Sequence, residues 1–194
     1  MLSTDEEQVE KFQSPLPFLR NFHRFIFGKE KPDVYTRLTF NINMIIWFSF
    51  ILWSILSFFT IKSRALILQV KGIPVEKVIH ARGVELGFKG NEFIDRLLTF
   101  NAIAIICWVI ILIGLILLFR KMNQYIYFIL GGAIFYVGMS IFYLSYTYFI
   151  EDTTFYDKIA LLILVTSTLF HYFLLKNEKS GGNINFFGES EEDE

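Results

Sequence analysis

Residues 97–119 read LLTFNAIAIICWVIILIGLILLF, twenty-three consecutive positions without an Asp, Glu, Lys or Arg. Two further charge-free runs, of 24 and 26 residues, occupy 38–61 and 125–150, and a run of 17 occupies 159–175. A helix rises about 1.5 Å per residue, so roughly 20 residues cross the hydrocarbon layer of a membrane. The sequence therefore predicts four membrane-spanning helices, at about 38–61, 97–119, 125–150 and 155–175.

The composition supports the same fold class. Hydrophobic residues make up 54% of the 194 positions and aromatic residues 18%, which is too apolar for an ordinary soluble domain of this length. The single cysteine, Cys107, excludes an internal disulfide. The net charge of −1 gives no reason to expect nucleic acid as a partner. We predict an all-α integral membrane protein, a four-helix bundle whose partners are membrane lipids and other membrane subunits or further copies of itself.

The regions flanking the bundle have their own signatures. In the N-terminal region, 1–37, apolar residues between 18 and 27 fall on one helical face while Arg20 and Arg24 fall on the other. This pattern predicts an amphipathic helix lying in the headgroup layer, although packing on the protein's own surface fits it equally well. The same region has no apolar core with a cleavage site, so we expect no cleavable signal peptide. Residues 176–194 end in a run of acids, which predicts a disordered acidic tail.

The polar loop 62–96 contains one further helix signal. Pro74 and Gly83 bracket an amphipathic stretch, and this order of the two residues predicts a short helix over 75–82. Residues 65–70 fit either an extension of the first span or a brief strand. The linker 120–124 permits only a tight turn, which makes the second and third spans antiparallel neighbours.

Small residues in the spans mark expected helix contacts, because association in lipid depends on close packing and interhelical hydrogen bonds. In the third span a small residue recurs every seven positions, at Gly131, Gly138 and Ser145, which predicts a packing seam. Other small residues expected at contacts between helices are Ser54, Ser57, Ala104, Cys107 and Gly114.

One group of polar residues shares a membrane depth in any orientation. Asn41 and Asn43 lie near the start of the first span, and His171 lies near the end of the fourth. Such a cluster suits either a lipid headgroup or small ligand, with His171 titrating near neutral pH, or hydrogen bonds between helices. The second role is the commoner one for polar groups at this depth.

The sequence gives only a slight preference for orientation. Lys and Arg residues near the membrane are almost equally divided between the two sides. Of the tight turns, one contains Arg120 and Lys121 and the other contains Glu151 and Asp152. Since positive residues are retained on the cytoplasmic side, this difference favours both termini in the cytoplasm or its topological equivalent.

No pattern indicates catalysis. Mid-depth positions of the spans hold no carboxylate or base, which transport coupled to protons normally requires. Three dispersed histidines make no metal-ligand set, and no nucleophile elbow or phosphate-binding loop occurs. We therefore assign no catalytic, cofactor or metal residues and expect a non-catalytic scaffold or accessory subunit of a membrane complex. The alternatives are a homo-oligomeric channel or membrane sensor and, more distantly, a membrane enzyme of lipid metabolism.

Overall fold

The computed structural model describes residues 32–63, 69–70 and 73–179. Within them the chain is almost entirely helical, and four helices are long and apolar enough to cross a membrane. These are the properties of a membrane protein. In chain order the elements are α3 (Val34–Lys62), β1 (Gln69–Val70), β2 (Ile73–Pro74), α4 (Val75–Glu85), α5 (Glu92–Phe119), α6 (Tyr125–Leu144), α7 (Tyr146–Glu151) and α8 (Phe155–Lys179).

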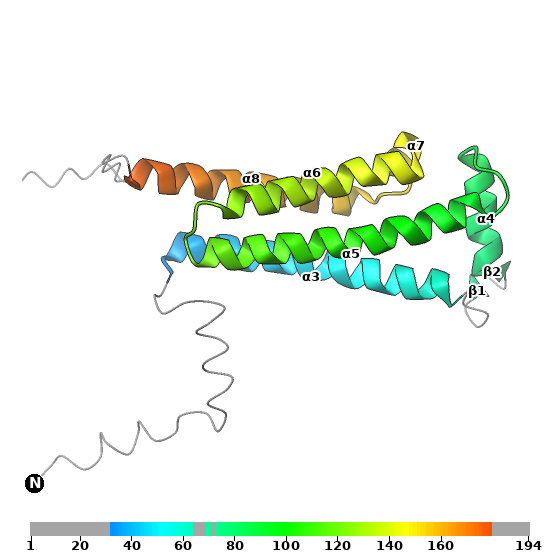
Figure 1. Cartoon of the computed structure of the whole chain (residues 1–194), viewed down its shortest axis with the longest axis horizontal. Helices are drawn as coiled ribbons and strands as arrows, with labels where there is room; N and C mark the ends of the chain where they lie inside the picture. The colour runs from blue at the N-terminus through cyan, green and yellow to red at the C-terminus, as the bar shows by residue number, and fades with distance from the viewer. Residues whose placement is uncertain (1–31, 64–68, 71–72, 180–194) are drawn as a thin grey trace, which may run out of the picture.

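Figure 1 shows the four long helices side by side, with the start of α3 and the end of α8 at one end of the bundle. We call this the terminal end, and we call the opposite end, where α4 and α7 lie, the loop end. Helices α5 and α6 are antiparallel and share the most extensive contact in the bundle, as the short linker predicts. The predicted interfacial helix with Arg20 and Arg24 lies outside the described residues, as does 180–194 of the predicted tail.

The helices begin and end where local hydrogen bonds allow. Asp33 caps α3 because its carboxylate accepts the backbone N–H of Thr36. At the end of α5, Lys121 adopts a positive φ of 54°. The N–H groups of Lys121 and Met122 close the helix by donating to carbonyls of its last turn. Helix α3 begins four residues before its charge-free run, and helix α5 begins five residues before its own.

The predicted span 125–150 is divided in two. Helix α6 ends at Leu144, and Ser145 has φ 91° and ψ 158°, a conformation that no helix can contain. The hydroxyl of Ser145 then accepts the N–H of Tyr148 and so caps the six-residue helix α7. Ser145 is therefore a helix boundary and not the third member of a small-residue seam.

The loop helix is also longer than predicted, because Gly83 lies within α4 and does not end it. A methyl group built on Gly83 would lie 2.6 Å from Cβ of Phe93, so the glycine permits close packing of α4 on α5. Gly87, with φ 88°, is the residue that terminates this helical segment. The ambiguous segment before α4 contributes Gln69–Val70, which pairs antiparallel with Ile73–Pro74 as a brief strand.

Helix α5 is the central element of the bundle and packs against α3, α4 and α6. Trp108 is fully buried at its middle and stacks on Phe50 of α3, with ring centroids 4.6 Å apart. Other hydrophobic residues with no exposed surface are Cys107, Ile111, Leu115, Leu118, Tyr125, Ile129, Leu144 and Leu164.

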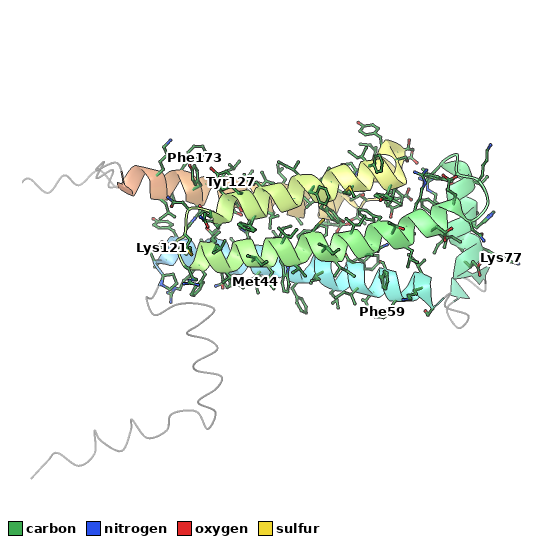
Figure 2. All side chains as sticks on the ribbon, viewed as in Figure 1. Met44, Phe59, Lys77, Lys121, Tyr127 and Phe173 are labelled. Atoms are coloured by element: carbon green, nitrogen blue, oxygen red, sulfur yellow. The ribbon has the colours of Figure 1, made fainter. Side chains whose placement is uncertain are left out.

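The outer surface of the bundle is as apolar as its interior. Ile45, Trp53, Ile134 and Phe142 are each at least 70% exposed along the long helices. Charged side chains gather at the ends instead, and Figure 2 shows Lys121 at the terminal end and Lys77 at the loop end. Exposing such a large apolar surface to water would be unfavourable, whereas its contact with the hydrocarbon of a membrane is not.

Candidate functional site

At the terminal end, His171 joins three helices through a chain of buried hydrogen bonds. Its Nε2 lies 2.8 Å from Oγ1 of Thr36 on α3, and its Nδ1 lies 2.9 Å from the hydroxyl of Tyr125 on α6. The Thr36 hydroxyl in turn donates to Oδ1 of Asp33 over 2.7 Å. We call these four residues the polar lock. Thr36, Tyr125 and His171 are each no more than 1% exposed.

The bonds of the polar lock determine which nitrogen of His171 carries the proton. Because the Thr36 hydroxyl gives its hydrogen to Asp33, Nε2 of His171 must donate to Thr36. In the neutral imidazole, Nδ1 then keeps its lone pair and accepts from the Tyr125 hydroxyl. A neutral imidazole thus satisfies both ring nitrogens, and through them His171 links α8 to α3 and α6.

Asp33 anchors the lock at the membrane boundary. Its Oδ1 lies 2.7 Å from Nζ of Lys121, which sits in the turn between α5 and α6. Burial alone would raise the pKa of Asp33, but hydrogen bonds from Lys121 and Thr36 outweigh burial and lower the pKa well below its usual range. The carboxylate therefore stays ionised and holds the α5–α6 turn against the start of α3.

Asn43 forms a second polar contact, about two helical turns along α3 from Thr36 of the polar lock. Its Nδ2 donates to Oγ1 of Thr168 over 3.2 Å, and its Oδ1 accepts from Oγ of Ser167 over 2.7 Å. Asn43 and His171 therefore line the same α3–α8 interface, as predicted from their depth. Asn41 does not join them, because it is exposed on the outer surface of α3.

The predicted small-residue seam separates into two kinds of glycine. Methyl groups built on Gly114 and Gly132 would lie 2.7 Å from Ile129 and Ile111, so these two glycines allow α5 and α6 to approach closely. Gly131 and Gly138 have nothing within 4 Å of the corresponding position and lie on the exposed side of α6. Among the described residues, no neighbouring helix approaches the position of a side chain at these two glycines.

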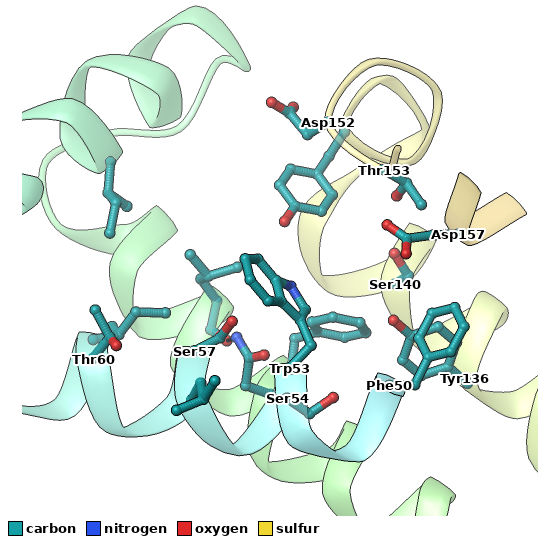
Figure 3. A pocket seen from close by; sticks show the side chains of 17 residues that line it. Phe50, Trp53, Ser54, Ser57, Thr60, Tyr136, Ser140, Asp152, Thr153 and Asp157 are labelled. Carbon is teal, nitrogen blue, oxygen red and sulfur yellow. Dashed lines mark hydrogen bonds between the residues drawn. The ribbon is translucent and has the colours of Figure 1, made fainter. Parts of the chain in front are cut away.

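A pocket of about 320 Å³ occupies the half of the bundle toward the loop end. We call it the loop-end pocket. Figure 3 shows side chains from α3, α6 and the α7–α8 turn converging on it. Its lining comprises Phe50, Trp53, Ser54, Leu56, Ser57, Thr60, Ile61, Ile79, Leu97, Phe100, Asn101, Tyr136, Ser140, Tyr148, Asp152, Thr153 and Asp157.

An ion-pair cluster fixes the edge of the loop-end pocket. The guanidinium of Arg82 on α4 binds both carboxylate oxygens of Asp152 and one oxygen of Glu151, at 2.7–3.0 Å. A third acid, Glu85, lies 2.8 Å from the same guanidinium. The hydrogen bonds that Arg82 donates to Asp152, Glu151 and Glu85 raise the pKa of Arg82 above its usual range. Burial raises the pKa of the nearby Tyr148 to about 12, so its hydroxyl remains protonated.

Sequence reasoning noted Ser54 but missed Ser140 and Asp157 as members of a common site. The sequence did contain a signal for this site, because Ser54, Ser140 and Asp157 lie on three separate segments at a similar distance from the loop end. Within residues 32–63, 69–70 and 73–179, no three His, Cys, Asp or Glu side chains lie close enough to hold a metal ion. Comparisons with protein-family models, curated proteins and solved structures found no match to this chain.

Proposed function

We propose that this protein is a non-catalytic accessory subunit or scaffold of a larger membrane complex. The observation that carries the proposal is the outer face of α6, where Gly131 and Gly138 lie two turns apart and touch no other part of the described chain. Glycine weakens a helix and adds nothing to a lipid contact, whereas it lets a second helix backbone approach closely. This face therefore suits a transmembrane helix of another subunit.

A groove at the same place strengthens the argument. It has a volume of about 290 Å³ and runs between α5 and α6 beside Gly131, with Ile110, Phe128 and Phe135 among its walls. Apolar ridges on both sides of a glycine give the interlocking shape that helix pairs use in membranes. The polar lock closes the terminal end of the bundle, which argues against a pore through a single copy.

Co-purification tests the proposal. The full chain is extracted from its native membrane in mild detergent, and the mass and composition of the particle are measured by mass photometry and protein identification. We expect a particle containing unlike chains. A particle of 22.8 kDa would contradict the proposal, and a whole multiple of that mass would favour the homo-oligomeric channel, with conductance in liposomes as the next measurement.

A pair of variants locates the interface. Gly138→Leu places a large side chain on the outer face of α6, and we expect it to release the partner. Thr166→Leu places similar bulk on the exposed side of α8 and serves as the control. If both variants retain the partner equally, the outer face of α6 is not the interface.

We further propose that both termini face the cytoplasm and that the N-terminal segment with Arg20 and Arg24 lies in the headgroup layer. The Arg120–Lys121 turn supports this orientation. Single cysteines introduced at Asn123 and Lys89 in a Cys107→Ser background would test it by labelling with an impermeant maleimide. Labelling of Asn123→Cys from the outside of intact cells would reverse the assignment.

A further inference from the structure

Two serine hydroxyl groups line the loop-end pocket, and neither has a hydrogen-bond partner among the described residues. Ser54 on α3 and Ser140 on α6 are each 3% exposed, and both line the pocket. Neither side chain makes a hydrogen bond to any residue that the structure describes, nor does the hydroxyl of Tyr136 between them. Hydroxyls at membrane depth are costly unless something bonds to them, so the pocket is suited to a ligand that supplies the missing bonds.

The contrast with the terminal end makes the pocket distinctive. There, the side chains of Thr36, Asn43 and His171 are hydrogen-bonded to side chains of neighbouring helices. The hydrogen bonds that join α3 to α8 in the described chain all lie in that terminal half. Toward the loop end, α3 is held instead by α5, and the loop-end pocket opens beside α3.

The two ends of the pocket differ in polarity. Asp152 and Asp157 flank the turn between α7 and α8, next to Ser140, and Figure 3 shows Asp157 and Thr153 on this side. Toward the middle of the bundle, the walls are aromatic and include Phe50 and Phe100. A molecule with one polar and one apolar end matches this gradient.

The charges select the kind of polar end. Among the described residues, Asp152 and Asp157 are the only charged ones that line the loop-end pocket, and none of its described lining residues is Lys, Arg or His. Asp152 is already bound by Arg82, and Oδ2 of Asp157 accepts from the hydroxyl of Thr154 over 2.7 Å. Oδ1 of Asp157 makes no hydrogen bond to another described residue, so it remains an acceptor. An anionic head would be repelled here, whereas an amine or alcohol would donate to it.

The pocket is reached from the side of the bundle. Trp53 and Leu56 belong to its lining and are also 70% and 52% exposed on the lipid-facing surface of α3. Because the rim of the pocket includes lipid-facing residues, a long-chain molecule can enter from the bilayer without crossing the polar loop.

We propose that the loop-end pocket binds a membrane amphiphile whose head is an amine or alcohol. The head donates to Asp157 and forms a second hydrogen bond with the Ser140 hydroxyl, and the alkyl chain packs against Phe50 and Phe100. With a volume of about 320 Å³, the pocket takes the head and part of one chain and leaves the rest in the bilayer.

Photolabelling of the full chain in phosphatidylcholine nanodiscs tests this proposal. Three probes carry the same diazirine-bearing alkyl chain and end in a primary amine, an alcohol or a carboxylate. After illumination, labelled peptides are mapped by mass spectrometry. We expect saturable labelling of pocket residues by the amine and the alcohol, competed by unlabelled long-chain amine. The carboxylate should label at least about tenfold less, as one lost charge-assisted hydrogen bond implies.

Variants separate the contributions of the two polar residues. Asp157→Asn keeps an acceptor oxygen but removes the charge, and it should weaken amine labelling about tenfold while changing alcohol labelling less. Ser140→Leu should block all three probes by filling the pocket, and Ser140→Ala provides a second test should the larger residue prevent folding. Asp95→Asn, at an exposed carboxylate outside the pocket, is the matched control. Circular dichroism and gel filtration establish that each variant is folded.

Three results would overturn the proposal. The first is labelling that does not saturate or that is spread evenly over lipid-facing residues such as Leu162 and Phe170. The second is equal labelling by the amine and the carboxylate, which would show that Asp157 does not select the head. The third is unchanged labelling in folded Asp157→Asn and Ser140→Ala proteins.

Discussion

Removing one oxygen atom from the polar lock tests its role most directly. Tyr125→Phe deletes the hydroxyl that is hydrogen-bonded to Nδ1 of His171 at 2.9 Å and leaves the rest of the ring in place. Both residues are buried, with Tyr125 fully inaccessible and His171 1% exposed. The substitution therefore removes one interhelical hydrogen bond and creates no large cavity.

The expected loss of stability follows from two terms. Interhelical hydrogen bonds in membranes contribute about 0.6 kcal/mol on average and up to about 1.7 kcal/mol. Leaving the imidazole acceptor buried without a donor adds a further cost, since an unsatisfied buried polar group costs about 1–3 kcal/mol. The two terms partly describe the same lost bond and cannot simply be added. We therefore expect the free energy of unfolding to fall by about 1–3 kcal/mol in total. The unfolding equilibrium constant would then rise roughly 5- to 150-fold.

Equilibrium unfolding measures this change. The protein in mixed lipid–detergent micelles is titrated with sodium dodecyl sulfate, and its helicity is followed by circular dichroism. Tyr127→Phe is the matched control, because Tyr127 lies half a turn away on α6 and is 77% exposed. An exposed substitution of this kind should change the free energy of unfolding by no more than about 0.5 kcal/mol.

The comparison has a clear negative outcome. If Tyr125→Phe and Tyr127→Phe shift the unfolding midpoint equally, the polar lock does not stabilise the bundle. A double-mutant cycle with Thr36→Val extends the test, because Thr36 and Tyr125 bond to the same imidazole. We expect the two substitutions to be non-additive by about 0.5 kcal/mol or more.

Three further predictions concern packing, pH and the loop end. Gly132→Leu should destabilise the isolated chain by about 1–3 kcal/mol in the same unfolding assay, because its side chain would meet α5, whereas Gly138→Leu should leave that stability unchanged. The pKa of Asp33 is lowered on folding, so its contribution is present above its unfolded pKa of about 4 and declines as the pH falls below that value. Unfolding measured between about pH 6 and pH 3 should show this decline, and Asp33→Asn should flatten it. Arg82→Gln should speed amide hydrogen exchange in α4, because three acids lose their common partner, while Lys77→Gln should not.

Much of the architecture could be predicted because it depends on local properties. The number of long helices follows from the charge-free runs, and the antiparallel pairing of α5 and α6 follows from a linker too short for any other arrangement. The face of α5 that contains Ala104, Cys107 and Gly114 is buried as expected. Helix ends were less predictable, since Ser145 and Gly87 end helices through backbone conformations that their neighbours in space help to hold.

The site residues show where the sequence was insufficient. Asn41 and Asn43 are equivalent in depth and chemistry, yet only Asn43 meets α8. Gly131 and Gly138 carry the heptad spacing, yet it is Gly132 that contacts α5. Successive residues of a helix point about 100° apart, so a small rotation of the whole helix decides which of two neighbours faces inward.

The sequence by itself determined that this chain forms four apolar helices in a fixed order, because hydropathy and linker length are properties of each segment alone. Only the tertiary structure decided that His171 meets Thr36 and Tyr125, and that Ser54, Ser140 and Asp157 surround one pocket. These contacts join residues from separate helices, and their formation depends on the rotation and tilt that packing around Trp108 imposes on every helix at once.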